Sequence, residues 1–274
     1  MERAPRQIPT AGAGLRIVQI TDIHLERETG GRLAGMDTDA SFAHVLGLLD
    51  RLPLAPQLIL ATGDLANNGY PEAYRRVRDA FDARPVPWAW LPGNHDERES
   101  MERVLGDGAP MERVLLAGAW QVILLDSSVP GEVGGELGEE ELARLDTLLA
   151  ARPDRHALVC LHHQPVPVGC AWLDEQAIAD ADRFFEVLGR HPQVRAVLWG
   201  HVHQDYNAER AGLRLLASPS TCIQFAPQSA GFRLDDRKPG LRVLDLQPDG
   251  SLRTEVLRIE GVELGFDREC TGYL

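Results

Sequence analysis

The sequence repeats one arrangement that restricts the fold: a short apolar run is followed within two residues by a glycine, a histidine or an acidic residue. These runs occupy residues 15–20, 58–62, 87–91, 121–125, 157–161 and 194–199. Apolar runs of this length predict buried strands. Predicted helices alternate with them at residues 40–49, 71–81, 98–105, 138–152 and 181–188. The alternation predicts an α/β fold with parallel strands and right-handed crossovers, in which ligands and catalytic groups concentrate at the carboxyl ends of the strands.

The C-terminal part of the sequence predicts a different arrangement. Three short apolar runs indicate strands, at residues 213–217, 241–246 and 252–257. The last two are joined by a predicted turn, Pro248-Asp249-Gly250. We expect these strands to complete a second sheet, antiparallel to their neighbours. Residues 30–39 predict a mobile loop, and the tail from Glu263 onward is expected to be loosely held.

The charge balance argues against a nucleic-acid partner. The chain has 28 basic and 41 acidic side chains, a formal net charge of −13, and no block of Lys or Arg. A nucleic-acid surface needs a basic stripe, because phosphate contacts supply most of that affinity. An anionic substrate would therefore need a local positive centre, which bound metal would provide.

No segment predicts export, a membrane span or a disulfide framework. Residues 1–13 lack the apolar core of a secretion signal, and no stretch reaches the roughly 18 apolar residues of a membrane span. The four cysteines lie far apart and form no Cys-x-x-Cys pair. We expect a cytoplasmic protein without a membrane partner. Its single domain would span residues 1–274, with a core of about residues 15–257 between a flexible N-terminal segment and a C-terminal tail.

Two of the strand ends carry pairs of potential ligands separated by one residue. Asp22 and His24 follow the first run, and His201 and His203 follow Gly200 after the last. In an extended backbone, residues i and i+2 point to the same side, so each pair can converge on an ion. Such a pair also occurs by chance on exposed strand ends. For His201 and His203, the position after Gly200 at a strand end favours metal binding.

Other strand ends add further candidates. Asp64 follows Gly63. The stretch 91–96 contains Asn94, which offers a neutral carbonyl oxygen, and His95, which offers a proton near neutral pH. The adjacent His162 and His163 point to opposite sides of an extended backbone, so only one can readily serve a given ion. Spacing alone does not decide which.

Some polar residues near these loops have two readings. Asp126 could hold a neighbouring histidine by a hydrogen bond or stabilise a turn. Asn67 and Asn68 could touch a substrate, but the ordinary polarity of a loop explains them equally well. Residues 218–225 could line a pocket or simply connect two strands.

Together these loops predict a centre of two metal ions. Six of the nine histidines follow apolar strands, and Asp22, Asp64 and Asn94 add oxygen ligands. Mixed nitrogen and oxygen ligation favours Fe, Mn, Zn or Co over Mg or Ca. Two such ions can share a carboxylate and a bridging hydroxide, which would attack a phosphodiester in line. His95 would then protonate the departing alkoxide.

Five blocks in this order resemble the signature of the calcineurin-like metallophosphoesterases. They are Asp22-x-His24, Gly63-Asp64, Gly93-Asn94-His95-Asp96, His162-His163 and Gly200-His201-x-His203. Within that superfamily, the chain most resembles the bacterial class III 3',5'-cyclic-nucleotide phosphodiesterases, the cyclic AMP phosphodiesterase branch. Further similar text lies at residues 19–22, 61–66, 90–96, 169–174 and 219–225. The resemblance covers about residues 15–257.

The resemblance implies a four-layer α/β/β/α sandwich of two mixed sheets, with a dinuclear site at the loop ends. One ion would take Asp22, His24 and His203; the other would take Asn94, His162 and His201, with Asp64 bridging them. The choice of His162 over His163 rests on relatives with a His-His-x-Pro-x-Pro motif. In such relatives the ions are divalent or trivalent transition metals, Fe or Mn foremost, with Zn or Co as alternatives.

The implied reaction is hydrolysis of 3',5'-cyclic AMP to 5'-AMP. His95, Asp64 and Asn94 would be catalytic, and the substrate would contact His24, Asp64, Asn94, His95 and His203. Two alternatives stay open: a phosphodiesterase for 2',3'-cyclic nucleotides or glycerophosphodiesters, and a nucleotide-sensing regulatory module with little turnover. The sequence leaves both a monomer and a homodimer open.

Overall fold

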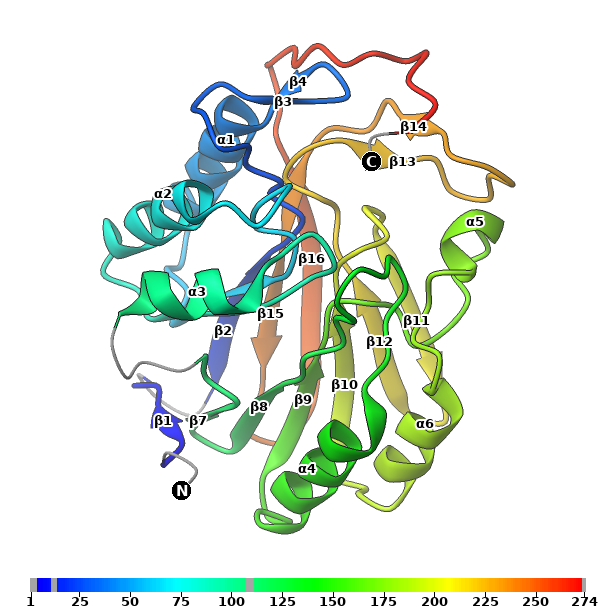
Figure 1. Ribbon diagram of the computed structural model, residues 1–274. Helices are drawn as coiled ribbons and strands as arrows, with labels where there is room; N and C mark the ends of the chain where they lie inside the picture. Colours follow the sequence, from blue (N-terminus) through cyan, green and yellow to red (C-terminus); the bar gives the residue numbers. More distant parts are fainter. Residues whose placement is uncertain (1–3, 11–13, 107–110, 273–274) are drawn as a thin grey trace.

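Two β-sheets form the centre of the molecule, and helices cover their outer faces (Figure 1). The computed structural model describes residues 4–10, 14–106 and 111–272. The strands of the larger sheet are β1 (Arg6–Gln7), β7 (Val114–Ala117), β8 (Trp120–Leu124), β9 (His156–Cys160), β10 (Val194–Trp199), β11 (Tyr206–Arg210) and β12 (Leu213–Ala217). Those of the smaller sheet are β2 (Leu15–Ile20), β5 (Leu58–Thr62), β6 (Trp88–Leu91), β15 (Gly240–Leu246) and β16 (Leu252–Arg258).

Strand order places the site-bearing strands side by side. The seven-stranded sheet runs β1-β7-β8-β9-β10-β12-β11, and the five-stranded sheet runs β16-β15-β2-β5-β6. The neighbours β2, β5 and β6 are parallel, as are β8, β9 and β10. The carboxyl ends of these strands therefore lie at the same edge of each sheet, which confirms the parallel pairing predicted from the sequence.

Three apolar layers separate the sheets and helices. One lies between the two sheets and joins residues such as Ile17 and Leu60 of one sheet to Leu158 and Leu198 of the other. The helices are α1 (Thr38–Asp50), α2 (Pro71–Asp82), α3 (Arg98–Leu105), α4 (Gly138–Ala150), α5 (Ala171–Asp174) and α6 (Ala181–Gly189). The first three pack on the outer face of the smaller sheet, and the last three on the larger. This is the predicted four-layer α/β/β/α sandwich.

The predicted antiparallel pairing of the C-terminal strands is confirmed for residues 241–246 and 252–257, but the prediction that all three strands join one sheet is wrong. Strand β12 joins the larger sheet, parallel to β10. Strands β15 and β16 instead extend the smaller sheet, because β15 pairs antiparallel with β2. An apolar run indicates that a strand is buried but not which neighbouring strand it pairs with. The sequence therefore could not assign these three strands to different sheets.

The predicted loop at residues 30–39 is also wrong. These residues form the hairpin of β3 (Arg32–Leu33) and β4 (Met36–Asp37) and the start of α1. Leu33 and Met36 are buried, and the side chain of Asp37 caps α1 by accepting from the backbone N–H of Ala40 at 2.9 Å. The C-terminal segment crosses this hairpin, where the backbone N–H of Asp267 donates to the carbonyl of Ala34.

The remaining elements are a small hairpin beside the larger sheet, β13 (Gln224–Phe225) with β14 (Leu234–Asp235). Among the residues that the structure describes, no helix has the length and apolar character needed to cross a membrane.

Candidate metal centre

The loops after β2, β5, β6, β9 and β10 bring the candidate site residues together. Four overlapping groups have ligand atoms within 4.8 Å of one another: Asp22, His24 and His203; Asp22, Asp64 and His162; His24, Asp64 and His95; and His162, His163 and His201. Asp22, His24, Asp64, His162 and His203 are each at most 1% exposed. Carboxylates and imidazoles from four separate loops thus share one buried volume.

Asp64 lies between the two predicted sets of ligands. Its Oδ2 is 3.5 Å from Nε2 of His24 and 3.2 Å from Nε2 of His162. Nε2 of His203 lies 3.4 Å from Oδ1 of Asp22 and 3.3 Å from Nε2 of His24. The backbone N–H of His95 donates to Oδ1 of Asp64 at 3.0 Å. This contact holds the loop that carries the neighbouring Asn94 against Asp64. A central Asp64 is the arrangement required of a carboxylate shared by two ions.

The backbone at these residues is not extended, contrary to the argument from residue spacing. Asp22, His24, Asp64, His201 and His203 all have φ between 47° and 62°, the left-handed region that non-glycine residues rarely adopt. Consequently His201 and His203 do not share a side: His203 meets Asp22 and His24, whereas His201 meets His162 and His163. Strained conformations of this kind cluster at functional sites, where the surrounding packing holds them.

Glycines permit the close approach of these loops. A Cβ atom at Gly63 would overlap the ring of His162, and one at Gly200 would overlap the hydroxyl of Thr21. At Gly93 the added atom would overlap the Asp64 carboxylate, so the absence of a side chain lets the two loops approach closely.

Hydrogen bonds to oxygen acceptors orient the imidazoles. Nδ1 of His162 donates to the Thr62 carbonyl, and Nδ1 of His203 to the Ile223 carbonyl, each at 2.8 Å. Nδ1 of His24 lies 3.2 Å from Oδ1 of Asn67. Since the acceptors engage Nδ1, Nε2 is the ring nitrogen left to face the centre, as is usual for metal-binding histidines.

Asn67 is a site residue that the sequence left ambiguous. Its Nδ2 donates to Oε1 of Glu26 at 2.7 Å, which turns its Oδ1 toward His24. Its backbone carbonyl accepts from Nδ1 of His95 at 2.9 Å. Asn67 therefore orients two histidines of the site, and no spacing pattern in the sequence indicates this.

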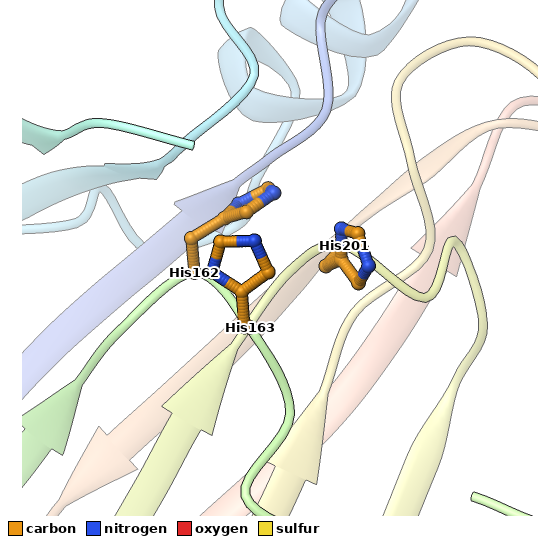
Figure 2. Close-up of side chains that lie close together, drawn as sticks. All are labelled: His162, His163 and His201. Atoms are coloured by element: carbon orange, nitrogen blue, oxygen red, sulfur yellow. The ribbon is translucent and has the colours of Figure 1, made fainter. Parts of the chain in front are cut away.

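His163 differs from His162 in having both ring nitrogens engaged by protein atoms. Its Nε2 donates to the Val133 carbonyl at 3.1 Å, and its Nδ1 lies 2.8 Å from Oγ of Ser127. Figure 2 shows the rings of His162, His163 and His201 gathered where their loops meet. The suggestion that Asp126 holds a histidine is wrong: its carboxylate pairs with Arg98 and Ser128, and the neighbouring Ser127 contacts His163.

The electrostatic environment suits cation binding. Burial lowers the pKa of His24 and of His163 to about 3, so both imidazoles are neutral. Burial also acts to raise the pKa of Asp64, but His162, His95 and His24 outweigh it and hold that pKa well below its usual value. For His162, attraction to Asp64 outweighs burial and raises the pKa to about 9. A bound cation would take the place of that proton.

Three of the buried side-chain polar atoms that lack a hydrogen-bond partner among the described residues belong to the candidate site. They are Oδ2 of Asp22, Oδ1 of Asn94 and Nε2 of His162. Buried polar atoms are nearly always paired, and leaving one unpaired is costly. All three belong to the predicted ligand set, and their mixture of nitrogen and oxygen fits transition-metal ions. The residues present therefore fit the implied ions.

Other residues that the sequence analysis missed support the loops. The Asp96 carboxylate accepts from the backbone N–H groups of Leu65, Ala66 and Gly93 at 2.9–3.2 Å. Phe225 stacks on His203 with ring centroids 4.1 Å apart. Asp96 belongs to a recognisable motif, but its contacts with Leu65 and Ala66 depend on a loop about 30 residues away in sequence.

Comparisons with known proteins agree with this geometry. The family model for calcineurin-like phosphoesterases matches residues 15–205. The 3',5'-cyclic adenosine monophosphate phosphodiesterase CpdA of Pseudomonas aeruginosa is 42% identical over 265 residues, 97% of each chain. CpdA of Escherichia coli K12 is 42% identical over 97% of this chain and 98% of its own. The 3',5'-cyclic-nucleotide phosphodiesterase alr5338 of Nostoc is 39% identical over 89% of this chain and 92% of its own.

Two solved structures share the fold. A dimetal phosphatase from Danio rerio superposes with a TM-score of 0.58 and 16% identity, covering 90% of this chain and 99% of its own. GAP50, the anchor in the inner membrane complex of Plasmodium, superposes with a TM-score of 0.62 and 14% identity. The match covers 92% of this chain and 87% of GAP50. Identities this low concern the fold alone, whereas the family model and the curated relatives extend to the ligand motifs. The chain belongs to the calcineurin-like phosphoesterase family.

Proposed function

We propose that the protein is a metal-dependent phosphodiesterase that hydrolyses 3',5'-cyclic AMP to 5'-AMP. The observation that carries this proposal is the combination of a complete, buried donor set with relatives of that activity aligned over 97% of this chain. The acidic net charge of −13 supports a small-molecule substrate over nucleic acid, and a cytoplasmic protein without a membrane partner remains part of the proposal. The apolar layer shared by both sheets supports their acting as one domain.

In this proposal Asp22, His24 and His203 hold one ion. Asn94, His162 and His201 hold the other, and Asp64 bridges them. His162 is preferred to His163 because its Nε2 faces the Asp64 carboxylate, whereas hydrogen bonds with Ser127 and Val133 engage both ring nitrogens of His163. When bound, two transition-metal ions, Fe or Mn foremost and Zn or Co as alternatives, supply Lewis acidity and lower the pKa of a water molecule.

His95 is the proposed proton donor. Its ring lies 4.8 Å from that of His24, and its Nδ1 donates to the Asn67 carbonyl. That contact fixes the ring, so a proton passed to the leaving O3' would come from Nε2. As water adds to phosphorus, the bond from phosphorus to O3' breaks and O3' takes this proton. Asp64 and Asn94, with His24, His95 and His203, would line the phosphate site.

The proposal is tested by comparing substrates. Purified protein supplied with Mn²⁺ is given 3',5'-cyclic AMP, 2',3'-cyclic AMP and a glycerophosphodiester, and products are followed by chromatography. Release of 5'-AMP from 3',5'-cyclic AMP is expected to be the fastest reaction. A tenfold or greater preference for another ester would show that the substrate assignment is wrong.

A matched pair of variants separates catalysis from simple binding. Asp64→Asn should lower the rate by orders of magnitude, because the central carboxylate is lost. Asp126→Asn is the control, since Asp126 also follows a strand but pairs with Arg98 outside the cluster. Nucleotide binding with negligible turnover, unaffected by Asp64→Asn, would instead favour a nucleotide-sensing module.

A further inference from the structure

The segment between β9 and α6 places a glutamine beside His201. The Asp174 carboxylate accepts from the backbone N–H groups of Val168 at 2.7 Å and Gly169 at 3.2 Å. On the other side, the backbone N–H of Ile178 donates to the Gln164 carbonyl at 3.1 Å. These hydrogen bonds hold the backbone on both sides of Gln176.

Gln176 contacts the imidazole of His201. Its Oε1 lies 3.0 Å from Nε2 of His201. Since an amide oxygen only accepts, the hydrogen of this bond belongs to Nε2 of His201, which leaves Nδ1 unprotonated. His201 is 5% exposed, and its own backbone N–H donates to Oδ1 of Asp22 at 3.0 Å, so the main chain that carries the ring is also held.

This orientation is the reverse of that in the other candidate imidazole ligands. His24, His162 and His203 each have Nδ1 engaged by an oxygen acceptor. In His201, Nε2 is the engaged nitrogen. If these four side chains bind ions, three use Nε2 and His201 uses Nδ1. The ring of His201 lies beside those of His162 and His163, with centroids 5.2 Å and 4.7 Å away, respectively.

We propose that Gln176 is a positioning residue that holds His201 as the Nε2–H tautomer and so makes Nδ1 its metal-binding atom. The inference rests on the ion assignment in the proposed function. A neutral imidazole carries one proton on one of two nitrogens, and the hydrogen bond to the other nitrogen decides which one can bind metal. Loss of the acceptor at position 176 removes that preference and frees the ring to turn.

Three variants test the role of Gln176. Gln176→Leu keeps the approximate size of the side chain but removes the acceptor, and Gln176→Glu keeps an acceptor. Gln57→Leu is the matched control: Gln57 is also half-buried, and its Oε1 accepts one hydrogen bond, from the backbone N–H of Arg16 at 2.7 Å. Gln57 precedes β5 and thus lies at the opposite end of that strand from Asp64.

Two measurements need no substrate. Nitrogen-15 NMR of the metal-free wild type should show His201 protonated at Nε2, and Gln176→Leu should lower the population of that tautomer. Titration with Mn²⁺ should show one of the two ions bound about 10- to 100-fold more weakly in Gln176→Leu, with the other unchanged. Gln176→Glu and Gln57→Leu should retain both properties of the wild type.

The proposal is overturned if wild-type His201 carries its proton on Nδ1, or if Gln176→Leu binds both ions as tightly as the wild type. The first measurement uses the wild type alone, so it decides the question even if Gln176→Leu fails to fold. A wild type that binds fewer than two ions would overturn this proposal and the ion assignment together. Normal binding of two ions without hydrolysis of cyclic AMP would overturn only the substrate.

Discussion

Gly93 illustrates how a single missing side chain makes the site possible. A Cβ atom there would lie 2.6 Å from the backbone nitrogen of Asp64 and 2.8 Å from its Cγ. Both distances are shorter than atoms tolerate, and neither group can move without displacing the strand end after β5. The candidate ligand Asp64 can occupy the centre of the site because position 93 is glycine.

Gly93→Ala should therefore lower the free energy of unfolding by about 1–3 kcal/mol, as overpacking does, and reduce the metal content. Urea denaturation and metal analysis of the purified variant measure the two effects. Gly189→Ala is the control, because no described atom lies within 4 Å of its added Cβ, and α6 ends there. Unchanged stability and metal content in Gly93→Ala would contradict the prediction.

At the scale of elements, an ion-pair cluster joins α4 to the end of α6. The Asp146 carboxylate lies 2.7 Å from Nε2 of His191 and 3.1 Å from Nη2 of Arg190. The hydrogen bond from His191 is the main reason that the pKa of Asp146 lies below its usual value of 3.8. Because the Asp146 side chain is 42% exposed, solvent screens the cluster and its contribution to stability is small.

The sign of the pH dependence follows from the lowered pKa. Folding favours the ionised carboxylate, so its contribution is fully present above pH 3.8 and is lost as the pH falls through the lower pKa of the folded protein. Asp146→Asn should lower the free energy of unfolding by less than about 1 kcal/mol at neutral pH. The difference from wild type should shrink in denaturation experiments below about pH 4. The exposed Asp154→Asn should show no comparable change.

At the scale of the whole molecule, Arg242 connects the two sheets. It lies on β15 of the smaller sheet and is 1% exposed. Its Nη2 donates to Oδ1 of Asp205 and to the Ala217 carbonyl, each at 2.6 Å, and its Nε donates to Oγ of Ser218 at 3.2 Å. These partners flank β11 and β12 of the larger sheet, close in sequence to His203. The buried guanidinium of Arg242 thus connects the smaller sheet to the segment of the larger sheet that follows His203.

Arg242→Met should lower the free energy of unfolding by about 1–3 kcal/mol, because the buried Ala217 carbonyl and Ser218 hydroxyl lose the donor that Arg242 supplies, whereas the Asp205 carboxylate is 41% exposed and stays hydrated. Chemical denaturation would measure this loss. The control is Arg75→Met on α2, whose ion pair with Glu72 is 4.0 Å long and 53% and 41% exposed. It should cost no more than about 1 kcal/mol. Equal losses in the two variants would show that Arg242 has no special role between the sheets.

The loops that gather at the candidate metal centre and most strands could be predicted because their signals are local. An apolar run followed by a side chain able to bind metal is contained within about ten residues, and each of the five blocks carries it, three of them with a glycine in between. The partner strand of β15 could not be predicted, because both edges of a sheet accept a buried apolar strand. The hairpin at residues 30–39 was missed since its strands are two residues each and depend on packing by Leu33 and Met36.

By itself the sequence determined the chemical groups available to this protein: which strands end in carboxylate, amide or imidazole, and in what order along the chain. Only the tertiary structure decided how those groups are used. It placed Asp64 between the two sets of ligands, engaged both nitrogens of His163, and brought Gln176 to His201. The physical reason is that a side chain's ligand atom depends on its hydrogen-bond partner, and those partners lie on loops that meet only when the two sheets pack.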